Sequence, residues 1–134
     1  MAAGALHLKI VTPTRVVVEA DVDEVWLPGI VGQVGVLPGH APLLTSLRIG
    51  ELGYRQGARE HYLALQWGFA EVATDAVTVL ADIAELPEEI DVETARADKA
   101  SAEDALRSAA GKAFEKQRAQ LESAVTRIAV AARR

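Results

Sequence analysis

Cysteine is absent from the 134-residue chain, aromatic residues make up only 4% of it, and it has a single methionine. Without cysteine the chain can form no disulfide and has no thiol chemistry. No apolar run approaches the roughly 18 residues that a membrane-spanning helix needs. The first residues also lack the basic and apolar regions of a signal peptide, so we expect a protein that is made and kept in the cytoplasm.

Apolar residues are plentiful, and they account for 50% of the chain. With so few aromatics, the core must be mainly aliphatic. The net charge of −5 is unevenly placed, because residues 1–86 have ten acidic and five basic side chains whereas residues 87–134 have nine of each. An acidic first part argues against a nucleic-acid partner, since phosphate binding needs a basic surface.

The first two thirds of the sequence consist of short alternating stretches. In residues 5–11, Leu6, Leu8 and Ile10 alternate with polar residues, which predicts a half-buried strand. Further strands are predicted at 15–19, 22–27, 43–49, 54–56, 59–66, 68–73 and 77–86, with a turn or bulge at 50–53. Many short strands separated by glycine and proline predict a β-sandwich or barrel-like domain over residues 1–87.

The pattern becomes helical after Pro87. Asp91 is suited to cap a first helix, and Gly111 is predicted to end or bend it before a second helix over residues 114–131. Residues 88–134 should therefore form an antiparallel two-helix hairpin, which makes the fold class α+β. The predicted seam is mostly alanine, and each methylene missing relative to leucine forfeits about 0.8 kcal/mol. We expect a weakly held hairpin.

The stretch from Leu27 to Leu44 is the most distinctive part of the sequence. It reads Leu-Pro-Gly-Ile-Val-Gly-Gln-Val-Gly-Val-Leu-Pro-Gly-His-Ala-Pro-Leu-Leu, with four glycines and three prolines. These residues predict ordered, partly buried turns rather than a regular strand or helix. The stretch resembles the signature loop of the ε subunit of F-type ATP synthases, and the resemblance extends over essentially the whole chain.

This resemblance implies a non-catalytic rotor subunit in the central stalk of the synthase. In this family the sandwich binds the γ subunit and the membrane c-ring, and it couples the proton-driven ring to the γ shaft for ATP synthesis. The resemblance places the contact with the c-ring and γ at a loop around Gln33, with the His40 turn beside it. The residues implied in this contact loop are Gly32, Gln33, Val34, Gly35 and His40.

For the helices, the resemblance implies a regulatory role. In this family the hairpin can extend along γ and block ATP hydrolysis. From the basic residues of the second helix, we expect contacts with an acidic segment of a catalytic β subunit. The expected contact residues are Arg118, Arg127, Arg133 and Arg134. The resemblance also implies a peripheral membrane protein on the cytoplasmic face of the bacterial inner membrane, attached only through the complex.

Several bacterial ε subunits bind a regulatory ATP through a motif Ile-Asp-x-x-Arg-Ala and arginines of the second helix. Here Ile90, Asp91 and Ala95 match the motif, but Thr94 stands at the arginine position and cannot pair with a phosphate charge. Two arginines of the second helix, Arg118 and Arg127, would remain for such a site. The alternative is that Asp91 only caps its helix. We therefore predict no resident cofactor.

Other candidate sites have simple structural explanations. His40 could be a base or a ligand, but a turn histidine bonded to nearby backbone is the favoured alternative. The three histidines show no metal-ligand spacing, and the glycines match no phosphate-binding fingerprint. The run Asp21, Asp23 and Glu24 indicates a solvated loop. No constellation predicts an enzyme, and a stand-alone interaction module would leave the signature stretch unexplained.

Overall fold

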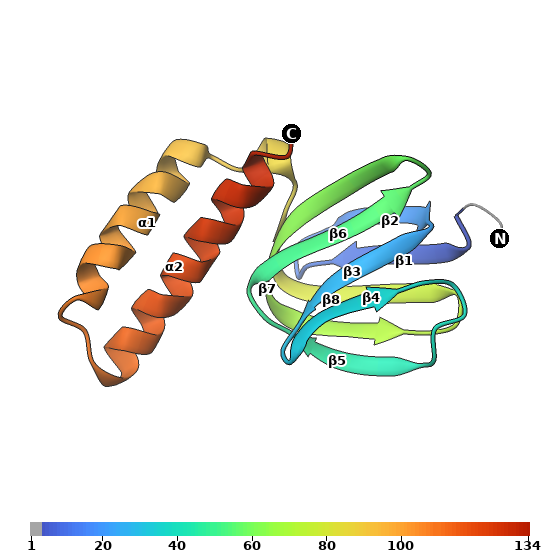
Figure 1. The fold of residues 1–134 in the computed structure, drawn as a ribbon, viewed down its shortest axis with the longest axis horizontal. Helices are drawn as coiled ribbons and strands as arrows, with labels where there is room; N and C mark the ends of the chain where they lie inside the picture. The colour runs from blue at the N-terminus through green and yellow to red at the C-terminus, as the bar shows by residue number, and fades with distance from the viewer. Residues whose placement is uncertain (1–3) are drawn as a thin grey trace.

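The computed structural model describes residues 4–134 as a β-sandwich followed by two helices (Figure 1), and the predicted fold class is confirmed. The helices and strands have the following bounds: β1 Leu6–Val11, β2 Val16–Val22, β3 Glu24–Gly29, β4 Gly32–Val36, β5 Leu43–Leu47, β6 Gly50–Gln56, β7 Arg59–Val72, β8 Ala76–Glu85, the 3-10 helix η1 Pro87–Glu89, α1 Val92–Leu106 and α2 Gly111–Ala131.

The strands follow the order β2-β1-β8-β7-β5-β3-β4, and β6 bridges β3 and β7. All pairs are antiparallel except β1 with β8. The long strand β7 belongs to both halves of the sandwich. Its first part pairs with β6 up to Leu65, and its second part pairs with β5 from Gly68 onward. One strand therefore joins the two layers.

A sharp change of backbone conformation in β7 makes this possible. Trp67 has a φ of 53° and Gly68 a φ of 139°. A Cβ on Gly68 would collide with the carbonyl oxygen of Leu80 in β8, so only glycine allows the two backbones to approach. The predicted separate strands at 59–66 and 68–73 are thus one continuous strand that bends at this point.

The core is aliphatic, as predicted from the scarcity of aromatics. Its fully buried side chains come from every second residue of a strand, as Leu6, Leu8 and Ile10 do in β1. The other large members are Val22, Val25, Leu27, Val36, Leu47, Leu52, Leu63, Leu65 and Val72. The period-two alternation of the sequence therefore identified the buried face correctly.

Two glycine-rich stretches form strands where turns were predicted. Residues 50–53 open β6, and residues 32–36 form β4, which pairs with β3. Gly53 is needed inside its strand, because a Cβ there would lie 2.8 Å from the Trp26 ring and 2.9 Å from the Tyr62 ring. Glycine here makes room for neighbouring side chains instead of breaking the strand.

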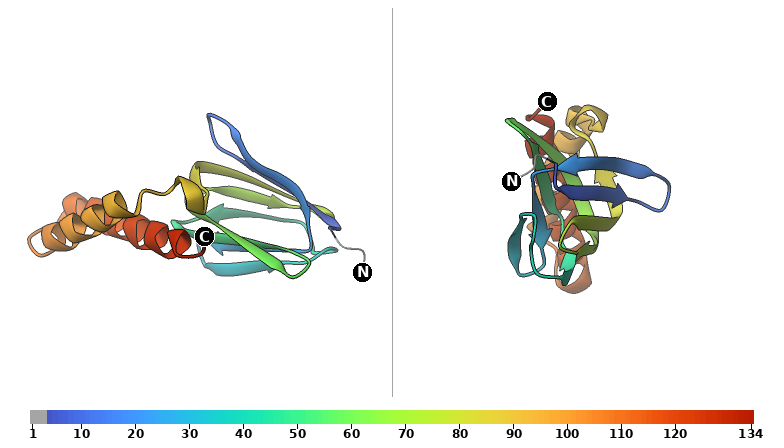
Figure 2. Two further views of the ribbon diagram at one scale, coloured as in Figure 1. Left: turned by 90° about the horizontal axis from the view of Figure 1, so that it is seen from above. Right: turned by 90° about the vertical axis from the view of Figure 1, so that its right-hand side faces the viewer.

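The helical hairpin extends beyond one end of the sandwich, away from the N-terminus (Figure 2). The Asp91 carboxylate caps α1 by accepting a hydrogen bond from the Thr94 backbone N–H at 3.1 Å. Helix α1 ends at Leu106, and Gly111, with a φ of 60°, begins α2 instead of ending α1 as predicted. The fully buried residues of the seam are alanines: Ala95, Ala102 and Ala124.

Asp23 ties three parts of the sandwich together instead of lying in the predicted solvated loop. One carboxylate oxygen accepts a hydrogen bond from the Gly4 N–H and the other from the Gly57 N–H, both at 2.6 Å. The Arg55 guanidinium lies 3.7 Å away. The bonds from Gly57 and Gly4 stabilise the ionised carboxylate and lower the pKa of Asp23.

The lowered pKa of Asp23 gives a testable pH dependence. Its contribution to stability is present above the unfolded-state pKa, about 3.9, and is lost as the pH falls through the lower folded-state pKa. Asp23→Asn should therefore unfold at a lower denaturant concentration than the parent at pH 7, and the difference should shrink toward pH 2–3. Asp82→Asn, at an exposed position in β8, is the matched control. An Asp23→Asn deficit that is the same at both pH values would contradict this role.

Candidate functional site

The signature stretch forms an edge strand and its flanking loops rather than one contact loop. Within residues 4–134, β4 pairs with β3 alone and lies at the end of the strand order. Gln33 stands opposite Pro28 in this pair, and its side chain is exposed. An edge strand presents unpaired backbone donors and acceptors along its free side, so it can accept contacts from a partner.

Gln33 lies at the start of β4, whereas His40 lies beyond its other end, which is at Val36. A hydrogen bond from the Ile30 N–H to the Ser46 carbonyl anchors the β3–β4 turn next to Gln33. Val31, in the same turn, is 97% exposed. The His40 turn is anchored elsewhere, since the N–H of the preceding glycine donates to the Thr74 carbonyl. His40 Nδ1 donates to the Ala41 carbonyl at 2.6 Å, which is the simple turn role.

A row of apolar side chains crosses the outer face of the sheet formed by β7, β8, β1 and β2. Phe69 pairs with Leu80, Leu80 with Val11, and Val11 with Val16 in the strand registers. Three of these four side chains are at least half exposed, at 55% for Phe69, 54% for Leu80 and 51% for Val16. We call these four residues the apolar row. A shallow hollow of about 310 Å³ lies beside it.

Sequence analysis missed the apolar row although the signal was present. Phe69 and Leu80 occupy the outward positions of strands whose inward positions are Ala70 and Val79. Large apolar residues on both faces of a strand indicate that the second face has a partner.

The residues that match the ATP motif are placed close to the junction between the helices and the sandwich. Ile90 is buried and packs with Ala64, Val130 and Ala131. The hydrogen bond from Thr94 lowers the pKa of Asp91, which is the behaviour of an N-cap. Arg118 lies nine residues before Arg127 on α2, about 13 Å along the helix axis. The structure therefore does not bring the two arginines to one point.

Arg127 is already paired within the chain. Its Nε and Nη2 donate to the two carboxylate oxygens of Glu85 at 2.8 and 3.1 Å. Both side chains are less than a quarter exposed, and Asp98 lies 3.9 Å from the guanidinium. A two-point bond of this kind occupies the face of the arginine that a phosphate would need.

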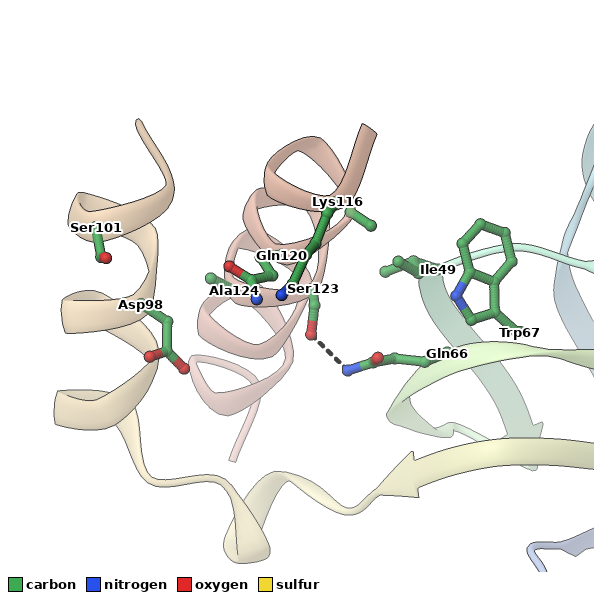
Figure 3. Close-up of a pocket in the computed structure, with 10 residues that line it drawn as sticks. Ile49, Gln66, Trp67, Asp98, Ser101, Lys116, Gln120, Ser123 and Ala124 are labelled. Carbon is green, nitrogen blue, oxygen red and sulfur yellow. Dashed lines mark hydrogen bonds between the residues drawn. The ribbon is translucent and has the colours of Figure 1, made fainter. Parts of the chain in front are cut away.

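A cavity of about 360 Å³ lies between the helices and the sandwich (Figure 3). Asp98 and Ser101 face it from α1, Lys116 and Ser123 from α2, and Gln66 hydrogen-bonds Ser123 across it. Among the residues of the described chain 4–134 that line it, Lys116 alone is cationic, and Asp98 offsets its charge. The residues that line the cavity thus lack the cluster of arginines that would bind the phosphates of a nucleoside triphosphate.

All four arginines expected to meet the catalytic subunits are paired with this chain's own groups. Arg127 pairs with Glu85, Arg133 with Glu51, and Arg134 donates to the Ile90 carbonyl at 2.9 Å. Arg118 makes a local pair with Glu122 at 3.3 Å and remains exposed. In the position shown here, the C-terminal helix is turned toward the sandwich.

Two features are absent from residues 4–134. No group of three or more His, Cys, Asp or Glu side chains there is arranged to hold a metal ion. Over the same residues, neither helix combines the length and apolarity that crossing a bilayer requires.

Comparison with known proteins gives consistent results for sequence and structure. The family described as ATP synthase, Delta/Epsilon chain, beta-sandwich domain matches residues 5–87. The ATP synthase epsilon chain 2 of Syntrophotalea carbinolica is 47% identical over 133 residues, which are 98% of this chain and 96% of the relative. The ATP synthase epsilon chain of Geotalea uraniireducens has the same identity and coverage.

Among solved structures, a chain in the OSCP/F1/c-ring part of the Euglena gracilis mitochondrial ATP synthase superposes with a TM-score of 0.83 at 22% identity. The alignment covers 100% of this chain and 84% of that one, so it includes both sandwich and helices. At this identity the similarity establishes the fold. The family match and the sequence relatives show that the chain belongs to the ATP synthase epsilon chain family, whose members are non-catalytic subunits.

Proposed function

We propose that this chain is the central-stalk rotor subunit that couples the γ shaft to the c-ring for proton-driven ATP synthesis. We further propose that its C-terminal helices restrain ATP hydrolysis. The observation on which the proposal rests is the 47% identity to epsilon chains over nearly the whole length, helices included. As part of that complex, the chain would sit at the cytoplasmic face of the bacterial inner membrane.

The apolar row is the surface best suited to the γ subunit. It offers an aromatic and three aliphatic side chains on a rigid sheet, next to a hollow that a partner side chain could fill. Exposed apolar surface of this kind costs solubility unless a partner covers it. A permanent contact with γ would do so and would fix the sandwich to the shaft.

The edge strand β4 and its flanking turns are the surface best suited to the c-ring. Gln33 offers an amide that can both donate and accept hydrogen bonds, and the exposed Val31 at the adjacent turn adds an apolar contact. His40 lies at the other end of the strand. The residues expected to contact the c-ring therefore extend along one edge instead of clustering in a single loop.

A regulatory role for the hairpin requires that residues 1–87 fold independently and that residues 88–134 are attached to them weakly. The large aliphatic core lies entirely within the sandwich, whereas the apolar contact at the helices is small and comprises Ala64, Ile90, Val130 and Ala131. The ion pairs of Arg127 with Glu85 and of Arg133 with Glu51 also join the two parts. Burying one Val or Ile side chain contributes about 1.5–3 kcal/mol. Docked and extended hairpins can thus differ by a few kcal/mol, a range in which a partner shifts the populations.

Removal of residues 88–134 tests this division and the inhibitory role. The remaining sandwich should unfold cooperatively and should still co-purify with γ, because it retains the whole core and the apolar row. The assembled enzyme should hydrolyse ATP faster than the parent enzyme. Unfolding of residues 1–87 alone would contradict the division, and unchanged hydrolysis at all ATP concentrations and proton-motive forces would contradict inhibition.

A substitution at Gln33 tests the contact with the c-ring. Gln33→Trp places a bulky ring on the β4 edge and should weaken assembly or proton-driven synthesis, while hydrolysis by the detached soluble head changes little. Gln56→Trp, at an exposed position at the end of β6, is the matched control. If both variants support synthesis equally, the β4 edge does not face the ring.

We also propose that regulatory ATP binds weakly or not at all. Thr94 offers no charge for a phosphate, and Arg127 is committed to Glu85. One charge-assisted hydrogen bond contributes about 1.5–3 kcal/mol, so its loss weakens binding roughly ten- to a hundredfold. Titration calorimetry of the isolated chain with ATP, with and without Mg²⁺, should give no micromolar binding, and Thr94→Arg should tighten it. Micromolar affinity in the parent would contradict this proposal.

A further inference from the structure

Glycines and aromatic rings alternate in a row on the outer face of the layer formed by β4, β3, β6 and the first part of β7. In the strand registers Gly35 of β4 stands opposite Trp26 of β3, Trp26 opposite Gly53 of β6, and Gly53 opposite Tyr62 of β7. The absence of a side chain at Gly53 lets both rings close over its backbone. The two aromatic side chains are therefore held in place by the sheet itself.

Arg133, two residues after the end of α2, binds at one end of this row. Its Nε donates to one Glu51 carboxylate oxygen at 2.9 Å, and its Nη2 lies 3.4 Å from the other. The guanidinium carbon lies 3.8 Å from the centre of the Tyr62 ring. The Tyr62 hydroxyl donates to Glu60 at 3.1 Å, which fixes the ring. Planar charge, two-point bonding and ring stacking are the features that distinguish arginine from lysine.

We propose that Glu51 and Tyr62 form a guanidinium-binding site on the sandwich, and that Arg133 is the ligand by which this site holds the C-terminal hairpin in its docked position. The importance of docking for hydrolysis rests on the function proposed above, but the site itself does not. Its function is to set how often the last turns of α2 leave the sandwich.

The position of the site supports this role. Glu51 and Arg133 are 82 residues apart in the sequence, so their bond joins the sandwich directly to the chain's end. Val130 and Ala131, just before Arg133, are the residues of α2 that pack against Ala64 and Ile90. Once Arg133 is released, this small apolar contact is the next part of the hairpin to be exposed to solvent. The carboxylate and ring would then lie open beside Trp26 and Gln33, which line the same 240 Å³ hollow.

Substitutions on the sandwich side separate this role from any contact that Arg133 makes with another subunit. Glu51→Gln removes the charge with little change of shape, and Tyr62→Leu removes the ring. Glu71→Gln is the matched control, because Glu71 is an exposed carboxylate of β7 far along the strand from Tyr62. Arg133→Lys keeps the charge but loses the planar, two-point geometry.

Amide hydrogen exchange of the intact chain, followed by mass spectrometry, reports even rare opening of the last turns of α2. In residues 126–134, Glu51→Gln, Tyr62→Leu and Arg133→Lys should each accelerate exchange about three- to tenfold at low salt, while Glu71→Gln should not. Arg133→Gln alone serves as the second arm of a double-mutant cycle. The double variant Glu51→Gln/Arg133→Gln should exchange no faster than the faster of its two single variants, because both substitutions remove one shared interaction. Exchange in the β7 core should remain unchanged.

Two outcomes would overturn the site: equal exchange rates at the C-terminal end of α2 in Glu51→Gln and Glu71→Gln, or acceleration that extends equally through the β7 core. Hydrolysis by the assembled enzyme is the separate readout. Glu51→Gln should lower it, because the freed hairpin keeps all its arginines. Faster exchange with unchanged hydrolysis would uphold the site and contradict the inhibitory function.

Discussion

The fold depends on the close approach of β7 and β8 at Gly68. At this point β7 leaves its pairing with β6 and begins its pairing with β5, so a single strand closes the two layers around the aliphatic core. A side chain at Gly68 would collide with the β8 backbone. The preceding Trp67 adopts a left-handed backbone conformation, which costs about 1–3 kcal/mol in a residue other than glycine. The large buried core offsets this cost.

Closure of the sandwich also determines where partners and helices can bind. One outer face presents the apolar row, the other presents the glycine–aromatic row, and β4 remains as a free edge between its two turns. The bend at Trp67 lies beside the cavity under the helices, where Gln66 meets Ser123 (Figure 3). The sandwich thus provides separate, rigid surfaces, while the hairpin is attached through small side chains and a few arginines. This asymmetry suits a part that stays fixed and a part that moves.

Sequence analysis predicted the elements that depend on local patterns. Alternation identified the inward residues of β1, and Asp91 was correctly expected as a possible cap. The errors in strand assignment occurred at glycines, because a glycine that breaks a strand and a glycine that makes room for a neighbour look alike in sequence. Gly53 is of the second kind, and its role depends on rings from two other strands.

Long-range polar contacts could not be predicted for a similar reason. Asp23 was expected in a solvated loop, yet its bonds to Gly4 and Gly57 depend on how distant strands are arranged. The pairing of Arg133 with Glu51 likewise appears only when the chain is folded. The family, in contrast, was recognised from one contiguous stretch, because the signature residues are adjacent in sequence.

The central claim is that release of the hairpin from the sandwich controls ATP hydrolysis but not coupling. Since the chain has no cysteine, Gln66→Cys and Ser123→Cys can be introduced and joined by a short bismaleimide, which locks α2 against β7. In the assembled enzyme, locking should raise ATP hydrolysis above that of the same variant left unlinked, while proton-driven synthesis and γ binding stay the same. Equal hydrolysis with and without the link, or loss of synthesis on linking, would contradict the account.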